Sequence, residues 1–192
     1  MIRTLALALA LTLGMATAAP AAPVAQPDRI PLDLRRTTFV VKDMEQALKF
    51  YRDALGLKVT YDNIIRTPRT AKDNASAERV LRLVLLRAND DYIGQMGLME
   101  YQKPVRTPRP AKTTTTLDPG DTVLVFNTTG LQAKFDKAKA LGVKVDTAPV
   151  PTTYPSYDGK GVINVMFSAF YDPDGNYVEL NEVTSGLPMA PK

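Results

Sequence analysis

The stretch "FYDPDGNYVELNE", residues 170–182, contains a turn followed by a strand. Its Pro-Asp-Gly segment, residues 173–175, combines a fixed φ, a side chain that bonds locally and a permissive last position, which together favour a tight turn. In the strand that follows, successive side chains alternate between faces. Val178 and Leu180 therefore share the face suited to packing beneath a helix, and Glu179 lies on the opposite face.

The same sequence of elements occurs twice along the chain. "ALGLKV" at residues 54–59 is matched by "ALGVKV" at residues 140–145. A helix-to-strand junction that recurs indicates two similar modules. Each module reads as strand, helix and three strands. The expected strands are 35–41, 57–61, 79–88, 92–101, 122–128, 143–147, 162–172 and 176–183, and the expected loops include 62–78 and 148–161.

The first helix has the clearest local signals. Asp43 suits the N-cap, and Gln46 three residues later completes a pair typical of a capping box. Gly56 follows the last apolar residue, where a left-handed cap favours glycine. The apolar positions between them follow helical spacing and form one stripe: Met44, Ala47, Leu48, Tyr51 and Leu55. In the second helix, which Gly142 ends, the expected stripe is Leu131, Phe135, Ala138 and Leu141.

Composition excludes several classes of function. The chain of 192 residues has no histidine and no cysteine, so Ser-His and Cys-His mechanisms are excluded. The net charge of +4 is small, and no basic helix is interleaved with aromatic residues. Nucleic acid is therefore not an expected partner.

The first residues resemble a secretory signal peptide. A positive start at Arg3, the apolar run "LALALALTLG" and the small-residue segment "ATA" at 16–18 predict cleavage near residue 18 and export to the periplasm or the medium. The apolar run is shorter than the about 20 residues that span a bilayer, so no stable span is expected after cleavage. A retained anchor is the alternative. Residues 19–33 then form a Pro/Ala-rich, disordered leader.

Two stretches, "FVVKDMEQALKFYRDALGLKV" and "FYDPDGNYVELNE", resemble the vicinal oxygen chelate superfamily, the glyoxalase, bleomycin resistance and extradiol dioxygenase group. The resemblance implies an α+β domain at 34–185, built from βαβββ modules at 34–103 and 120–185 joined by a linker at 104–119. It implies mixed sheets curled around a cleft, with the helices on the outer face. Some members of the family form dimers, so a homodimer is compatible with it.

Metal-dependent members of the family hold one divalent cation with four side chains. By resemblance, these positions fall on Arg36, Glu100, Val123 (or Thr122) and Glu179. Two carboxylates and water could hold Mg²⁺ or Ca²⁺ weakly, but a guanidinium has no acceptor. We therefore expect no tightly bound metal or other cofactor, and expect Arg36 to take the place of the ion between the two glutamates. The alternative is that Arg36 points into solvent.

Two functions follow from this interpretation. The first is a metal-free protein whose cleft binds a small molecule through Arg36, Glu100 and Glu179, with Tyr154 and Tyr157 as aromatic walls. Arg36 could hold an anionic group of that molecule. The second is a metal-dependent glyoxalase-like lyase or isomerase, or a dioxygenase, in which Glu100 or Glu179 is the general base. A third hypothesis is a vestigial cleft in a protein that contacts another protein.

Overall fold

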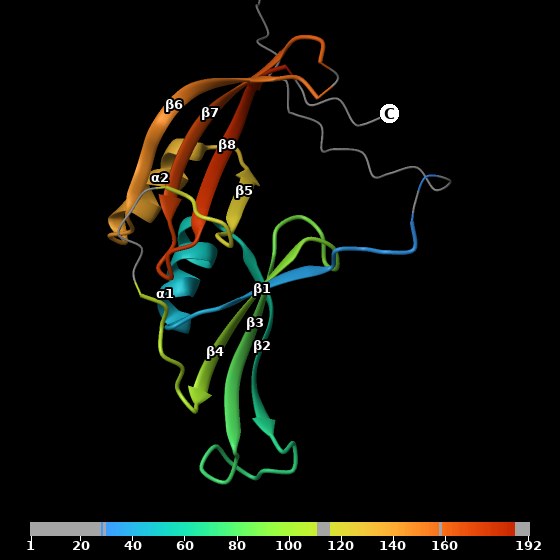
Figure 1. Cartoon of the computed structure of the whole chain (residues 1–192), viewed down its shortest axis with the longest axis vertical. Helices are drawn as coiled ribbons and strands as arrows, with labels where there is room; N and C mark the ends of the chain where they lie inside the picture. Colours follow the sequence, from blue (N-terminus) through green and yellow to red (C-terminus); the bar gives the residue numbers. More distant parts are fainter. Residues whose placement is uncertain (1–27, 29, 111–115, 158, 187–192) are drawn as a thin grey trace, which may run out of the picture.

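A computed structural model describes residues 28, 30–110, 116–157 and 159–186. It confirms the predicted α+β fold of two βαβββ modules (Figure 1). The first module contains β1 (Arg36–Val40), α1 (Met44–Leu48), η2 (Lys49–Ala54, a π-helical continuation of α1), β2 (Lys58–Thr67), β3 (Arg79–Arg87) and β4 (Gln95–Lys103). The second contains β5 (Val123–Asn127), α2 (Leu131–Ala140), β6 (Val145–Pro155), β7 (Val162–Tyr171) and β8 (Tyr177–Ser185).

Each module forms its own four-stranded mixed sheet. The strand orders are β1-β4-β3-β2 and β5-β8-β7-β6, so the first strand of each module lies at an edge and pairs in parallel with the last. The remaining pairs are antiparallel. A parallel return needs a crossover, and the helix of each module supplies it.

Local sequence signals set the ends of the first helix. The Asp43 carboxylate accepts a hydrogen bond from the Gln46 backbone N–H at 3.0 Å. Gly56 adopts φ of 90°, and its N–H donates to the Arg52 carbonyl at 3.1 Å, which closes the C-terminal end. All five residues of the predicted stripe are buried. The stripe misses Phe50, which is also fully buried.

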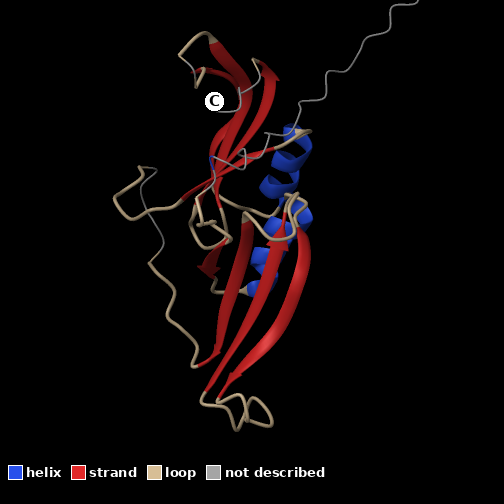
Figure 2. Ribbon diagram, turned by 90° about the vertical axis from the view of Figure 1, so that its right-hand side faces the viewer, coloured by secondary structure: helices blue, strands red, loops and turns tan. Residues whose placement is uncertain are grey.

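Both helices lie on the same side of the sheets (Figure 2) and pack into one apolar core. The Phe50 ring meets that of Phe170 edge to face with centroids 5.5 Å apart, and Phe135 stacks on Phe170 at 6.1 Å. Val178 and Leu180 face this core, as the alternation predicts. The two modules therefore share one hydrophobic interior.

The turn at residues 172–176 joins the modules through a buried network. The Tyr51 hydroxyl donates to Asp172 Oδ2 at 2.6 Å. The same carboxylate accepts hydrogen bonds from the backbone N–H groups of Asp174 and Asn176 and from the Asn176 side chain, at 2.8–2.9 Å. A buried carboxylate needs such donors. The turn residues thus fix the position of the first helix as well as their own hairpin.

Three expectations about element ends are corrected. Residues 148–155, expected in a loop, extend β6, and residues 62–67 extend β2. Both are edge strands, where proline is tolerated because one side needs no ladder hydrogen bond. Register shifts between Val145 and Val150 accommodate the Pro-rich sequence. Leu141, expected in the apolar stripe of α2, is exposed at the C-cap because the helix ends there.

The predicted signal peptide at 1–18 and most of the predicted leader at 19–33 lie outside the described residues. Within the described residues, no helix has both the length and the apolar character needed to cross a membrane.

Candidate functional site

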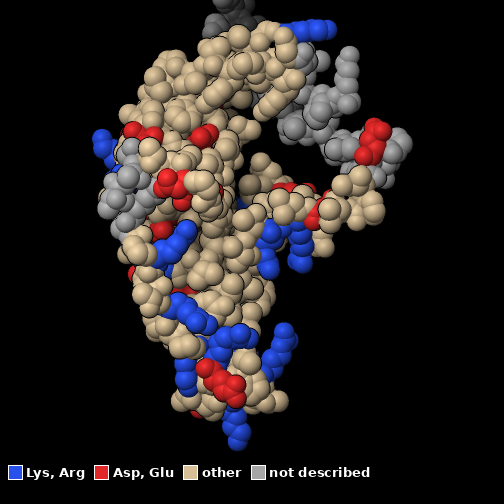
Figure 3. Space-filling model, viewed as in Figure 1, with Lys and Arg blue, Asp and Glu red and all other residues tan. Residues whose placement is uncertain are grey.

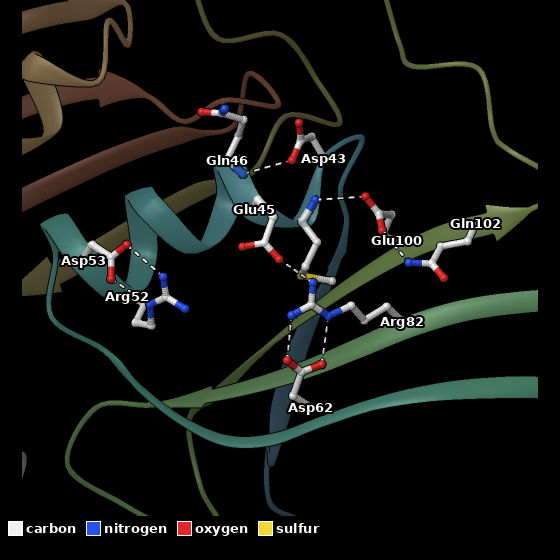
Figure 4. Close-up of polar contacts among 10 residues, drawn as sticks. Asp43, Glu45, Gln46, Arg52, Asp53, Asp62, Arg82, Glu100 and Gln102 are labelled. Carbon is white, nitrogen blue, oxygen red and sulfur yellow. Dashed lines mark hydrogen bonds and ion pairs between the residues drawn. The ribbon is translucent and has the colours of Figure 1, made fainter.

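A glutamate from the last strand of each module holds the start of that module's helix. Glu100 Oε1 on β4 accepts a hydrogen bond from the Met44 backbone N–H at 3.0 Å, and its Oε2 accepts one from the Gln102 side chain at 3.1 Å (Figure 4). On β8, the Glu182 carboxylate accepts hydrogen bonds from the N–H groups of Gly130 at 2.8 Å and Leu131 at 3.0 Å. These contacts satisfy N–H groups that have no partner inside the helix.

The strand register shows which positions correspond between the modules. Thr38 and Val125 each lie six residues before the first residue of their helix. Thr38 is opposite Gly97, and Val125 is opposite Glu179. The counterpart of Glu179 is therefore Gly97. This corrects the assignment of the second ligand position to Glu100, which is three residues further along and is used to cap a helix.

Arg36 lies partly buried on β1, on the sheet face turned away from the helices. A Cβ atom added to Gly97 would lie 3.2 Å from Arg36 Cδ, so the arginine stem covers this glycine. Among the hydrogen bonds and ion pairs of the described residues, none joins Arg36 to Glu100 or Glu179. The expected cluster of three charged groups is not formed, because Glu100 turns toward α1 instead.

A cavity of about 500 Å³ lies on the corresponding face of the second sheet. All of its walls come from the second module. Three predicted ligand-binding residues meet there: Glu179 from β8, Tyr154 from β6 and Tyr157 from the turn after β6. Arg36 and Glu100 are not part of its lining. The other lining residues are Val125, Asn127, Pro155, Ile163, Val165, Asn181 and Val183.

Glu179 sits in an environment that disfavours its charge. Burial raises the pKa of its carboxyl above the usual value for glutamate. Burial, and then the charge of Glu179, raises the pKa of the Tyr154 phenol. The nearby Tyr177 hydroxyl is occupied, because it donates to Asp146 Oδ2 at 3.0 Å. In the described part of the chain, no side chain donates a hydrogen bond to Glu179, which lines the cavity.

Asn181 is a cavity residue that the sequence analysis missed. It is only 8% exposed, and its Oδ1 is buried without a hydrogen-bond partner. An unpaired buried acceptor of this kind is unfavourable by about 1–3 kcal/mol unless something binds it. The signal was present in the alternation, since Asn181 lies two residues after Glu179 and thus on the same face.

A second cavity, of about 670 Å³, lies between residues 106–110 of the linker and the turn at 172–176. Its walls include residues 106–110, which adjoin residues outside the described ranges. It contains none of the predicted site residues.

The side chains do not fit the divalent cation that the fold family implies. The four corresponding strand positions carry Arg36, Gly97, Val123 and Glu179, so only one carboxylate is at hand. Among the described residues, no group of three or more Asp or Glu side chains could hold an ion. Divalent cations need more oxygen ligands than one carboxylate offers.

Comparison with solved structures finds several that are similar to this chain. A glyoxalase family protein from Bacillus cereus matches with a TM-score of 0.61 and 12% identity, over 84% of this chain and 100% of that one. Trypanothione-dependent glyoxalase I of Leishmania major matches at 0.48 and 19%, over 79% and 86%. An antibiotic binding protein from a Streptomyces strain matches at 0.46 and 19%, over 81% and 100%. No curated protein matches the chain.

A family model described as the glyoxalase/bleomycin resistance protein/dioxygenase superfamily matches residues 33–180. This range includes the first module, the second module as far as residue 180 in β8, the turn at 172–176 and Glu179. The chain therefore belongs to the glyoxalase/bleomycin resistance protein/dioxygenase superfamily.

Proposed function

We propose that the cavity on the second sheet binds a small organic molecule and does so without a tightly bound metal. One observation carries this proposal: Glu179, Tyr154 and Tyr157 meet around one cavity that is also lined by Asn181, whose Oδ1 is buried without a partner. A volume near 500 Å³ is within the range of small-molecule sites, about 300–1,000 Å³.

The composition of the walls supports this function. Most of the wall is apolar, with a small number of polar groups that converge on it. This is the usual composition of a ligand site, in which apolar area supplies affinity and polar groups fix orientation. Tyr154 and Tyr157 add broad, rigid contact surface. Tyr157 is 80% exposed at the rim, where a bound molecule could cover it.

A matched pair of variants tests the proposal. Val125 lines the cavity and is 58% exposed, whereas Val123 lies on the same face of the same edge strand, is 40% exposed and does not line it. Val125→Phe should project a ring into the cavity and obstruct it, and Val123→Phe should not. In a thermal-shift screen of a small-molecule library, hits on the wild type should persist with Val123→Phe and disappear with Val125→Phe. Hits that persist equally in both variants would contradict the proposed site.

The alternative of a metal-dependent enzyme that uses both Glu100 and Glu179 finds no support in this geometry. Both Glu100 oxygens are engaged, one by the Met44 backbone N–H at the start of α1 and the other by the Gln102 side chain on β4. Glu179 lies in a cavity that Glu100 does not line. Elemental analysis and an activity screen with and without Mg²⁺, Mn²⁺, Ni²⁺ and Zn²⁺ test this. Stoichiometric metal together with turnover that EDTA abolishes would overturn the metal-free proposal.

We also propose that the protein is exported after cleavage near residue 18, on the basis of the N-terminal pattern. N-terminal sequencing of the protein from each cell fraction tests this, and an intact Met1 in the mature protein would contradict it. Light scattering of the purified protein would show whether it forms the homodimer that the family resemblance suggests.

A further inference from the structure

Two hydrogen-bond acceptors on β8 line the cavity, beside hydroxyl and amide groups that can also donate. Glu179 is a pure acceptor when ionised, and the Asn181 Oδ1 is an acceptor without a partner. Both project from the same face of β8, two residues apart, which places them about 7 Å from each other along the strand. A ligand that satisfies them must present N–H or O–H donors.

The formal charge on the lining of the cavity is negative. Glu179 is the one formally charged residue among the ten that line it, and none of them is Lys or Arg. Basic side chains are instead prominent over the first module (Figure 3). A negatively charged wall without a compensating cation favours a positively charged ligand and disfavours an anion. The expectation of an anionic ligand depended on Arg36, which does not line this cavity.

The remaining walls define the body of that ligand. Val125, Ile163, Val165 and Val183 give an apolar floor, and the rings of Tyr154 and Tyr157 flank it. Apolar and aromatic surface binds an apolar or planar body, and a tyrosine face also attracts a cation within about 6 Å.

We propose that the ligands of this cavity are cationic amines carried on an apolar or aromatic body, with the ammonium group on Glu179 and a second donor directed toward Asn181 Oδ1. This inference rests on the proposed function, since it names the ligand class of the same site. Glu179 supplies the charge that selects the amine. Asn181 supplies an acceptor whose pairing the ligand completes.

Three probes with one shared body separate ligand class from simple binding: 2-(1-naphthyl)ethylamine, 2-(1-naphthyl)ethanol and 1-naphthylacetate. Dissociation constants are measured by calorimetry at pH 7 on the full protein. The amine should bind about tenfold more tightly than the alcohol, because a charge-assisted hydrogen bond is roughly twice as strong as a neutral one and about 1.4 kcal/mol is tenfold. The carboxylate should bind more weakly than the alcohol.

Two variants assign the preference to its residues. Glu179→Gln should reduce the amine-to-alcohol ratio to near one while alcohol binding is retained, and Asn181→Asp should increase that ratio by adding a second charge. A ratio near one in the wild type, a ratio unchanged by Glu179→Gln, or no binding of any probe would overturn the amine inference. The proposed function has a separate readout, because alcohol binding or library hits that Val125→Phe abolishes would uphold the site even if the amine preference failed.

Discussion

Glu100 and Glu182 occupy equivalent positions in the two modules, and each carboxylate accepts backbone hydrogen bonds at the start of its own module's helix. The distances, 2.8–3.0 Å, are those of strong hydrogen bonds. A negative charge at this end is further favoured by the helix dipole. Both glutamates are therefore part of the scaffold, and the cavity takes its charge from Glu179 alone.

Loss of the second of these caps should destabilise the fold. Glu182→Ala removes the partner of two backbone N–H groups and should lower the free energy of unfolding by about 1–2 kcal/mol. Urea denaturation measures this, with Glu78→Ala as the control because Glu78 is exposed and the described structure gives its side chain no hydrogen bond. Equal stability of the two variants would show that the cap is dispensable.

Glu100 and Glu179 should respond differently to the same substitution. Glu100→Gln should lower stability by roughly 1 kcal/mol through its weakened contact with Met44, and should leave binding of the naphthyl probes unchanged. Glu179→Gln should change probe binding. Calorimetry and denaturation on both variants check this. A loss of probe binding in Glu100→Gln comparable to that in Glu179→Gln would show that Glu100 takes part in binding.

Tyr51 and Asp172 should be energetically coupled through their buried hydrogen bond. Tyr51→Phe removes a 2.6 Å hydrogen bond to a carboxylate and should cost about 1.5–3 kcal/mol. In a double-mutant cycle with Asp172→Asn, the two effects should fall short of additivity by about 1 kcal/mol or more. Tyr61→Phe, at an exposed tyrosine on β2, is the control. Full additivity would mean that the joint between the modules does not depend on this bond.

A side chain at position 97 should destabilise the fold while Thr38 faces that position. An added Cβ would lie 2.5 Å from Thr38 Oγ1, closer than non-bonded atoms allow. Gly97→Ala should therefore cost about 1–3 kcal/mol. Combining it with Thr38→Ala, which removes the two nearest atoms, should restore part of that loss. If the double variant is less stable than either single variant, the clash is not the cause.

Glu179→Gln should also change how stability depends on pH. Burial raises the pKa of Glu179 in the folded state, so its contribution to stability is complete below the unfolded pKa, near 4.3, and is lost as pH rises through the folded pKa. The variant cannot ionise. It should therefore gain stability relative to the wild type between pH 4 and pH 7. Thermal unfolding of ligand-free protein at pH 4, 5.5 and 7 measures this, and a gap that narrows toward pH 7 would contradict it.

Local signals in the sequence were sufficient to predict the first helix and its ends. Asp43, Gly56 and the stripe between them act within a few residues of one another, so their effect depends little on the rest of the fold. The extent of β6 was not predictable in the same way. Its prolines favour a loop by local preference, and only the position of the strand at a sheet edge makes them acceptable.

The candidate site was predicted in part. Alternation placed Glu179 on the face opposite the core, and the same rule would have found Asn181. The second ligand position was assigned to Glu100 because it was located along the sequence without a comparison of the two modules. Aligning "GLME" at 97–100 with "ELNE" at 179–182 shows that Glu100 corresponds to Glu182 and Gly97 to Glu179.

The location of every cavity wall within one module has an implication for how such a protein can diversify. Substitutions on the open face of β7 and β8 could alter ligand choice without disturbing the Tyr51–Asp172 joint or either helix cap. The first module, whose matching position is a glycine lying under an arginine, would remain as an unchanged support. Duplication followed by divergence of one half is thus a route by which a symmetric ancestor could acquire new binding preferences.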